Sequence, residues 1–172
     1  MIAFLRFVGI LNAAVWCGSA IFMVAGLPAI FSAKLKELLT VPGVGFAAEA
    51  LVARFFAVQI VCGVIALAHL TAEWLYAGRP AGRLNLGLAM ALFWAALIGG
   101  FWVQPKMQEL HRLKYFGRTL IERTQAGKTF ADWHGISECV NLVVIAGLVV
   151  YLWRVSNPDD TPRFGNFNKI RG

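Results

Sequence analysis

The stretch LNLGLAMALFWAALIGGFWV, residues 84–103, is almost wholly apolar and contains no charged side chain. An α-helix needs about 20 residues of this kind to cross the hydrocarbon of a bilayer, which is about 30 Å thick. The stretch therefore predicts a transmembrane helix.

The chain as a whole has the composition of a membrane protein, because 59% of its 172 residues are apolar and only 15% are charged. Three further stretches are long and apolar enough to cross a bilayer. The predicted fold is all-α, a four-transmembrane-helix bundle with an amphipathic helical linker between the third and fourth helices. We place a membrane domain at residues 1–154 and an extended polar tail at 155–172, with the spans at about residues 5–31, 50–76, 84–105 and 132–154.

Four spans place both termini on one side of the membrane, named side A here, together with the turn at residues 77–83. Side B carries the connections at residues 34–49 and 104–132. Lys and Arg are enriched in cytoplasmic loops, but the 16 basic residues divide into seven on side A and nine on side B. This near balance leaves the orientation open and favours side B as cytoplasmic only by a small excess. We expect a multi-pass protein of a bacterial inner membrane.

The long side B connection has the periodicity of an amphipathic helix. Its apolar residues recur at three- and four-residue steps among Lys, Arg and Glu. These residues are Met107, Leu110, Leu113, Leu120 and Ile121. The linker either prolongs the third span out of the membrane or lies on the membrane surface. We expect it to end at Gly127, and the fourth span to start just before His134 with a capping box formed by Thr129 and Asp132.

Small residues let transmembrane helices approach each other closely. The first span offers Ala14 with Gly18, and the third has an unbroken ridge of small residues at four-residue steps. This ridge comprises Gly87, Ala91, Ala95 and Gly99. We interpret both features as helix-packing contacts.

Polar side chains are costly inside a bilayer, and two spans collect them on one face each. The stripe of the fourth span comprises His134, Ser137, Glu138 and Asn141. The stripe of the second span comprises Gln59, Cys62, Ala66, His69 and Glu73. Both follow helical spacing, so each lies on one side of its helix. We expect the two stripes to face each other inside the bundle, and Arg54 to form an ion pair with Glu138.

A histidine and a carboxylate one turn apart also suit a metal or proton site. The metal candidates are His134 and Glu138, with His111 or Glu109 from the linker. His69 is a candidate cofactor-binding residue, as a haem ligand between helices. At about 1.5 Å of rise per residue, His69 and His134 differ in depth by about 20 Å, which excludes one haem or metal held by both. The sequence leaves a haem or a transition metal open as a cofactor.

No catalytic residues are predicted, because the sequence has no nucleophile beside a base, no glycine-rich phosphate loop and no HExxH motif. Cys17, Cys62 and Cys139 lie within spans and form no CxxC pair, so we interpret them as small hydrophobic residues. The net charge of +7 comes from residues that flank the spans. It favours lipid headgroups over nucleic acid as a partner.

Four short patterns carry a resemblance to a known family. They are Val15-Trp16-x-Gly18 with Phe22, Pro28-Ala29-x-Phe31, Val103-x-Pro105-Lys106, and His134-Gly135-x-Ser137-x-x-x-Asn141-Leu142. Together they resemble the transmembrane protein 205 family, a domain of unknown function, over roughly residues 4–154. The resemblance implies four spans and a distant kinship with copper-resistance D-like and haem-binding four-span membrane proteins. The last pattern is the most specific, and His69 belongs to none of them.

The leading functional hypothesis is a membrane protein without catalytic activity, which acts as a small scaffold or accessory subunit of a membrane assembly. One alternative is a metal- or haem-binding membrane protein. Another is a part of a metal or small-molecule transport or resistance system. Membrane lipids, other membrane proteins and further copies of the chain are the expected partners.

Overall fold

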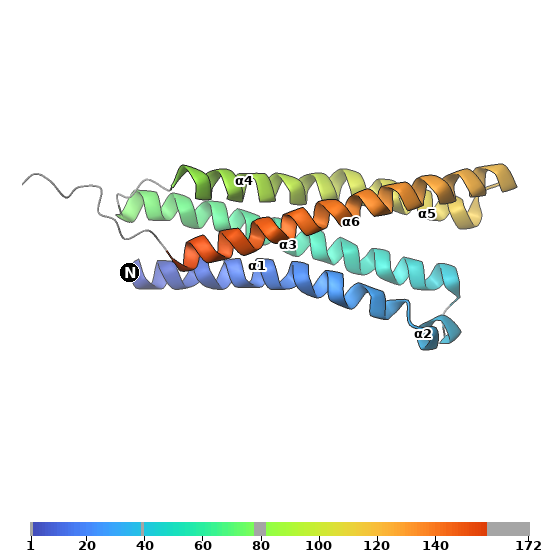
Figure 1. Ribbon diagram of the computed structural model, residues 1–172, viewed down its shortest axis with the longest axis horizontal. Helices are drawn as coiled ribbons and strands as arrows, with labels where there is room; N and C mark the ends of the chain where they lie inside the picture. The colour runs from blue at the N-terminus through green and yellow to red at the C-terminus, as the bar shows by residue number, and fades with distance from the viewer. Residues whose placement is uncertain (1, 39, 78–81, 158–172) are drawn as a thin grey trace, which may run out of the picture.

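The computed structural model describes residues 2–38, 40–77 and 82–157, which form six α-helices and one π-helical turn joined by short connections (Figure 1). In chain order they are α1 (Ile2–Ile30), α2 (Ala33–Leu38), α3 (Val41–Ala77), α4 (Arg83–Ile98), the π-helical turn η1 (Gly99–Val103), α5 (Gln104–Phe116) and α6 (Leu120–Ser156). Four helical stretches are long and apolar enough to cross a membrane, and no strand occurs in the described ranges. The all-α, four-span fold is confirmed, and the chain is a multi-pass membrane protein.

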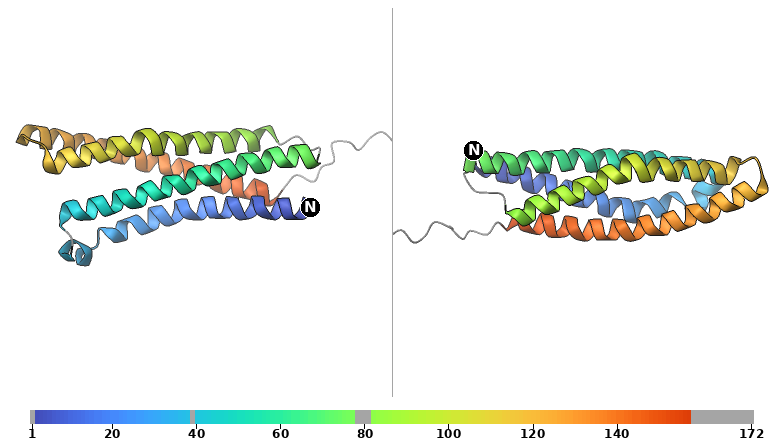
Figure 2. Two further views of the ribbon diagram at one scale, coloured as in Figure 1. Left: turned by 180° about the vertical axis from the view of Figure 1, so that it is seen from behind. Right: turned by 90° about the horizontal axis from the view of Figure 1, so that it is seen from above.

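The long helices lie side by side in a bundle (Figures 1 and 2). α1 packs against α3 and α6, and α4 packs against the same two helices. α3 and α6 therefore occupy opposite corners of the bundle. The predicted polar stripes lie on these two helices, so the expectation that the stripes face each other is wrong.

The third span leaves the membrane as one continuous helical rod. α4 passes through η1 into α5, so the rod extends from Arg83 to Phe116. Pro105, near the start of α5, has no N–H, and its ring would clash with the carbonyl four residues back in a regular helix. The π-helical turn just before it adds a residue to the helix and accommodates the proline. Of the two alternatives for the linker, prolongation of the third span is correct.

α6 begins earlier than predicted. Its N-cap is Thr119, whose Oγ1 accepts a hydrogen bond from the backbone N–H of Glu122 at 3.1 Å. Glu122 Oε2 accepts in turn from the backbone N–H of Arg118 at 2.8 Å, so both side chains satisfy open donors at the start of the helix. Gly127 and Thr129 lie well inside α6. The predicted linker end at Gly127 and the capping box at Thr129 are therefore wrong.

The bundle is longer than a bilayer is thick. The 37 residues of α6 extend over about 56 Å, against about 30 Å of hydrocarbon. Trp102 and Trp133 meet edge to face at 5.5 Å. Because Trp prefers the membrane interface, we take this level as the side B limit of the hydrocarbon. We name the helices beyond this level the side B extension. It comprises residues 41–53, 104–116 and 120–132.

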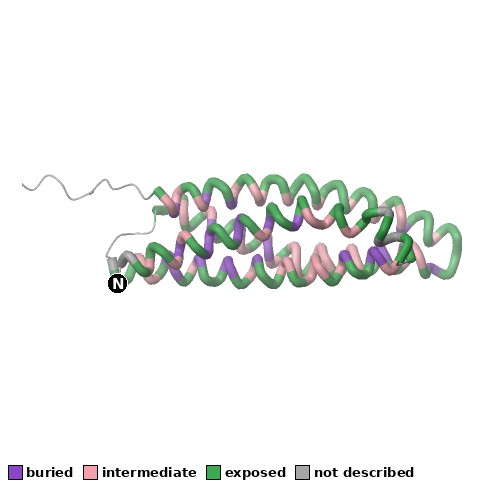
Figure 3. Tube along the Cα trace, turned by 90° about the horizontal axis from the view of Figure 1, so that it is seen from below, coloured by how far each residue is buried: buried purple, intermediate pink, exposed green. Residues whose placement is uncertain are grey.

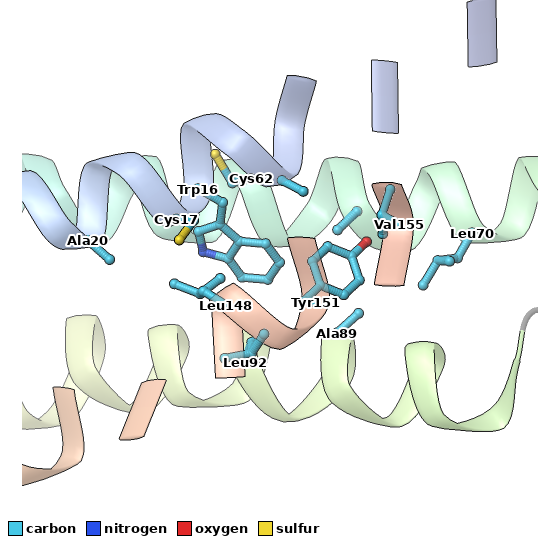
Figure 4. Close-up of a cluster of buried hydrophobic side chains, with 12 residues drawn as sticks. Trp16, Cys17, Ala20, Cys62, Leu70, Ala89, Leu92, Leu148, Tyr151 and Val155 are labelled. Atoms are coloured by element: carbon cyan, nitrogen blue, oxygen red, sulfur yellow. The ribbon is translucent and has the colours of Figure 1, made fainter. Parts of the chain in front are cut away.

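The main hydrophobic core lies toward the other end of the bundle, near side A (Figure 3). Figure 4 shows its side chains. Trp16 of α1 and Tyr151 of α6 are among its largest fully buried side chains, and their rings meet edge to face at 5.9 Å. Leu148 of α6 and Ala89 and Leu92 of α4 belong to the same cluster. This core joins α1, α3, α4 and α6 around one aromatic pair.

The three cysteines occupy two environments. Cys17 and Cys62 are buried in the hydrophobic core, which agrees with their interpretation as small hydrophobic residues. Cys139 is exposed on the outer surface of α6. It therefore faces the lipid side of the bundle.

The small-residue ridge of α4 divides between a helix contact and the outer surface. Gly99 lies beneath the ring of Phe56 from α3, where a Cβ would not fit. Gly87 has no atom within 4 Å of where a Cβ would lie, and Ala91 is exposed, whereas Ala95 is half-buried. The ridge contacts α3 at its side B end.

Two predicted regions lie partly outside the described residues. The side A turn includes residues 78–81, and the polar tail includes residues 158–172. α6 continues through the start of the predicted tail and ends at Ser156.

Candidate functional site

The buried polar side chains of α3 bind α1. Nε2 of Gln59 donates hydrogen bonds to Oγ of Ser19 at 2.9 Å and to the carbonyl of Trp16 at 3.4 Å. Nδ2 of Asn12 on α1 donates to the carbonyl of Cys62 at 2.9 Å. Asn12 and Gln59 are both buried, and lipid tails offer no hydrogen-bond partners for their side-chain amides. These bonds therefore satisfy the amides and fix the register of the two helices.

His69 makes a further contact of this kind. Its Nε2 lies 2.9 Å from the carbonyl of Leu5, and its ring lies over Gly9, where a Cβ would not fit. A carbonyl only accepts, so Nε2 is the donor, and Nδ1 is buried without a partner in the described part of the chain. Ligation of iron through Nε2 would require the ring to leave Leu5 and Gly9. This arrangement does not fit the interpretation of His69 as a haem ligand.

A second buried histidine lies on side B, between α3 and α5. Nδ1 of His111 lies 2.7 Å from Oε1 of Glu49, and both atoms are shielded from solvent. The two side chains therefore lie within ion-pair distance, although neither atom has a partner of hydrogen-bond geometry among the described residues.

Aromatic rings and a glycine enclose this imidazole. Gly45 of α3 leaves room for the ring of His111, where a Cβ would clash. The rings of Phe46, Tyr115 and Phe130 lie at centroid distances of 5.3, 5.0 and 5.8 Å from it. These residues come from α3, α5 and α6. His111 therefore joins all three helices of the side B extension.

The metal candidates of the fourth span form a separate, exposed pair. Nε2 of His134 lies 3.2 Å from Oε1 of Glu138, and their side chains are 51% and 69% exposed. The predicted ion pair between Arg54 and Glu138 does not form, because α3 and α6 occupy opposite corners of the bundle. His134 stacks on Phe130 at 5.9 Å, and His111 contacts the same ring.

The remaining polar residues of the fourth span do not add donors to this pair. Oγ of Ser137 donates to the carbonyl of Trp133 in its own helix at 2.8 Å. Asn141 is half-buried, two turns of α6 from His134. The stripe predicted on this helix is therefore a surface feature rather than a lining of the bundle interior.

The His and Glu side chains that were predicted as metal ligands on side B lie in pairs rather than in one cluster. Glu109 binds Lys106 at 2.9 Å, and the ring of Phe130 contacts both His111 and His134. Within the described ranges, no three His, Cys, Asp or Glu side chains gather as a metal site would require. The predicted metal candidates do not share one site.

The sequence analysis did not single out Glu49. One signal was present, because His111 follows Leu110 and lies four residues after Met107, on the apolar side of the linker helix. A histidine on a buried helix face needs a polar partner. Periodicity gives no information about which acidic residue of another helix supplies it.

A protein-family model matches residues 11–115, which is more than half of the chain. The chain belongs to the DUF4149 family, a domain of unknown function. The comparison with curated proteins found no match, and neither did the comparison with solved structures.

The DUF4149 match covers part of the site. It includes the α1–α3 bonds of Asn12 and Gln59 and the Glu49–His111 pair, whereas His134 and Glu138 lie beyond its end. The motif at His134, which was the most specific part of the resemblance to the transmembrane protein 205 family, is therefore outside the matched residues. The match supports neither that finer resemblance nor a kinship with copper-resistance D-like proteins.

Proposed function

We propose that this DUF4149 protein is a membrane protein without catalytic activity, a small scaffold or accessory subunit that binds a partner protein through its side B extension. The proposal rests on the shape and chemistry of the end of that extension. The buried polar side chains inside the spans bind neighbouring helices, which agrees with a structural role.

The observation that carries the proposal is an exposed apolar tip where α5 turns into α6. The apolar tip comprises Phe116, Leu120 and Ile121, whose exposed fractions are 61%, 79% and 79%. Leu120 lies about 20 Å along α6 from Trp133, beyond the hydrocarbon and the headgroup layer. Large apolar side chains grouped in water are typical of protein interaction sites.

The surface beside the tip favours an acidic partner. A shallow groove of about 370 Å³ is lined by Leu120, Ile121, Thr124, Gln125 and Lys128. Arg118 and Arg123 are exposed around it. An apolar centre with a basic rim complements a partner with an apolar centre and an acidic rim.

The alternatives are a metal- or haem-binding protein and a part of a metal or small-molecule transport or resistance system. They rest on the two His–Glu pairs and on the finer resemblance to the transmembrane protein 205 family. Each pair offers two donors, fewer than the three or four that a metal site uses. The apolar tip therefore supports the accessory role better.

The test compares the size of the wild-type protein with that of two variants, each extracted from its native membranes in mild detergent. Leu120→Ala combined with Ile121→Ala should reduce a larger assembly to the size of the isolated bundle. The matched control is Leu142→Ala combined with Val143→Ala, which removes similar apolar area from the exposed face of α6 within the membrane. This control should leave the assembly intact.

Two results would contradict the proposal. One is a wild-type protein that migrates as the isolated bundle in every mild detergent. The other is purified protein that contains a stoichiometric metal or haem and turns over a substrate. Absorption spectroscopy and elemental analysis of the same sample test the second.

A further inference from the structure

An open groove of about 640 Å³ lies between α3 and α5 on side B, between the apolar tip and the membrane. Its lining residues are Phe46, Glu49, Pro105, Gln108, Glu109, Arg112 and Leu113. The groove is within the usual size of ligand sites, and its walls contain an aromatic ring, carboxylates and a guanidinium group. It is distinct from the tip.

The depth of the groove matches the headgroup layer of the membrane. Glu49 precedes Arg54, where the crossing part of α3 begins, by about 8 Å along the helix. The headgroup layer extends about 5 to 8 Å beyond the hydrocarbon on each side. A phospholipid beside α3 and α5 therefore has its polar end at the level of the Glu49 side of this groove.

The groove presents both signs of charge. Oε1 of Glu49 faces His111, and the Glu49 side chain keeps 21% of its surface exposed toward the groove. Arg112 has no hydrogen-bond or ion-pair partner among the residues that the structure describes. Glu109 is paired with Lys106. Glu49 and Arg112 are therefore the charged groups with bonding capacity left for a ligand.

Helix direction brings these two groups toward a similar height. Arg112 lies about 15 Å along α5 from Trp102, farther from the membrane than Glu49. Long side chains lean toward the N-terminus of their own helix, so Arg112 leans back to the membrane and Glu49 leans away from it. One headgroup with both signs of charge can therefore reach both side chains.

We propose that this groove binds the headgroup of a phospholipid that carries a primary ammonium, as phosphatidylethanolamine does. Its phosphate binds the guanidinium of Arg112, which matches phosphate geometry. Its ammonium donates hydrogen bonds to Glu49. A quaternary ammonium has no N–H to donate, and a glycerol headgroup has no cation, so both should bind more weakly.

The test is native mass spectrometry of delipidated protein in mild detergent. Phosphatidylethanolamine, phosphatidylcholine and phosphatidylglycerol with the same acyl chains are added at equal concentration. One phosphatidylethanolamine should bind per chain, about tenfold more tightly than either of the others, which corresponds to about 1.4 kcal/mol. Arg112→Gln and Glu49→Gln should each weaken this binding about tenfold.

Charge-matched controls lie outside the groove. Lys128→Gln and Glu37→Gln remove one exposed charge each and should leave lipid binding unchanged. If Glu49→Gln fails to fold because it loses the His111 pair, Arg112→Gln decides the question, since Arg112 is exposed. Circular dichroism identifies a variant that does not fold.

Three outcomes would overturn the proposal. Equal binding of phosphatidylglycerol would show attraction to phosphate alone. Preference for phosphatidylcholine would show recognition by the aromatic ring of Phe46 instead of Glu49. Unchanged binding in Arg112→Gln would place the lipid elsewhere. None of these outcomes bears on the apolar tip, so the proposed function is tested separately.

Discussion

The imidazole of His69 on α3 lies directly over the backbone of Gly9 on α1. A side chain at position 9 would clash with the ring, so only glycine fits there. The ring is held there by the bond from its Nε2 to the carbonyl of Leu5. His69 is therefore part of the interface between α1 and α3.

The contact predicts that Gly9→Ala destabilises the bundle, although alanine is the better helix former. The added Cβ meets the His69 ring, and overpacking of this kind costs about 1 to 3 kcal/mol. Unfolding in mixed micelles, followed by far-UV circular dichroism, measures the change. The matched control is Gly87→Ala, where no atom lies within 4 Å of the added Cβ, and it should be neutral or stabilising by up to about 1 kcal/mol. Equal effects of the two substitutions would argue against the His69 contact.

The position of the start of α6 predicts that alanine substitutions at Thr119 and Thr129 have different effects on stability. Thr119→Ala removes the N-cap oxygen and should cost about 0.5 to 2 kcal/mol of stability. Thr129→Ala lies inside the helix and should change stability by less than about 0.5 kcal/mol. Thermal or denaturant unfolding of the two variants compares them. A larger loss from Thr129→Ala would mean that the helix starts there instead.

Gly127 provides an independent test of the continuity of α6. In the structure it is a helix-interior residue whose added Cβ would make only ordinary contact with Lys114. Gly127→Ala should therefore stabilise the protein by about 0.5 to 1 kcal/mol. Loss of stability on this substitution would indicate that the helix ends at Gly127.

The two His–Glu pairs predict different coupling energies. Double-mutant cycles with Glu49→Gln and His111→Gln should give a coupling of about 1 to 3 kcal/mol, because the pair is buried at 2.7 Å. The same cycle with His134→Gln and Glu138→Gln should give about 0.5 kcal/mol or less, because that pair is largely exposed. Equal coupling energies would contradict the difference in burial.

The four spans could be predicted from the sequence because each depends only on local composition. Residues 84–103 predict a crossing helix whatever surrounds them. The start of α6 was misplaced because Thr119 with Glu122 and Thr129 with Asp132 are similar local patterns. The structure uses the first, where α5 ends at Phe116 and a short turn leads into α6.

The site was predicted less well because it depends on which helices are neighbours. Periodicity placed Gln59 and His69 on one face of α3, and they do share an interface. It could not show that α1, rather than α6, lies opposite that face. For the same reason, it gave no partner for His111, which finds Glu49 more than sixty residues away in the chain.

The central claim is that the apolar tip of the side B extension binds a partner protein. The most direct measurement is photocrosslinking in native membranes with benzoyl-phenylalanine at Ile121, and with the same group at Val143 on the lipid-exposed face of α6. The account predicts one protein adduct of defined mass from position 121, abolished by Leu120→Ala, and only lipid adducts from position 143. The absence of a protein adduct at 121, or identical adducts from both positions, would contradict it.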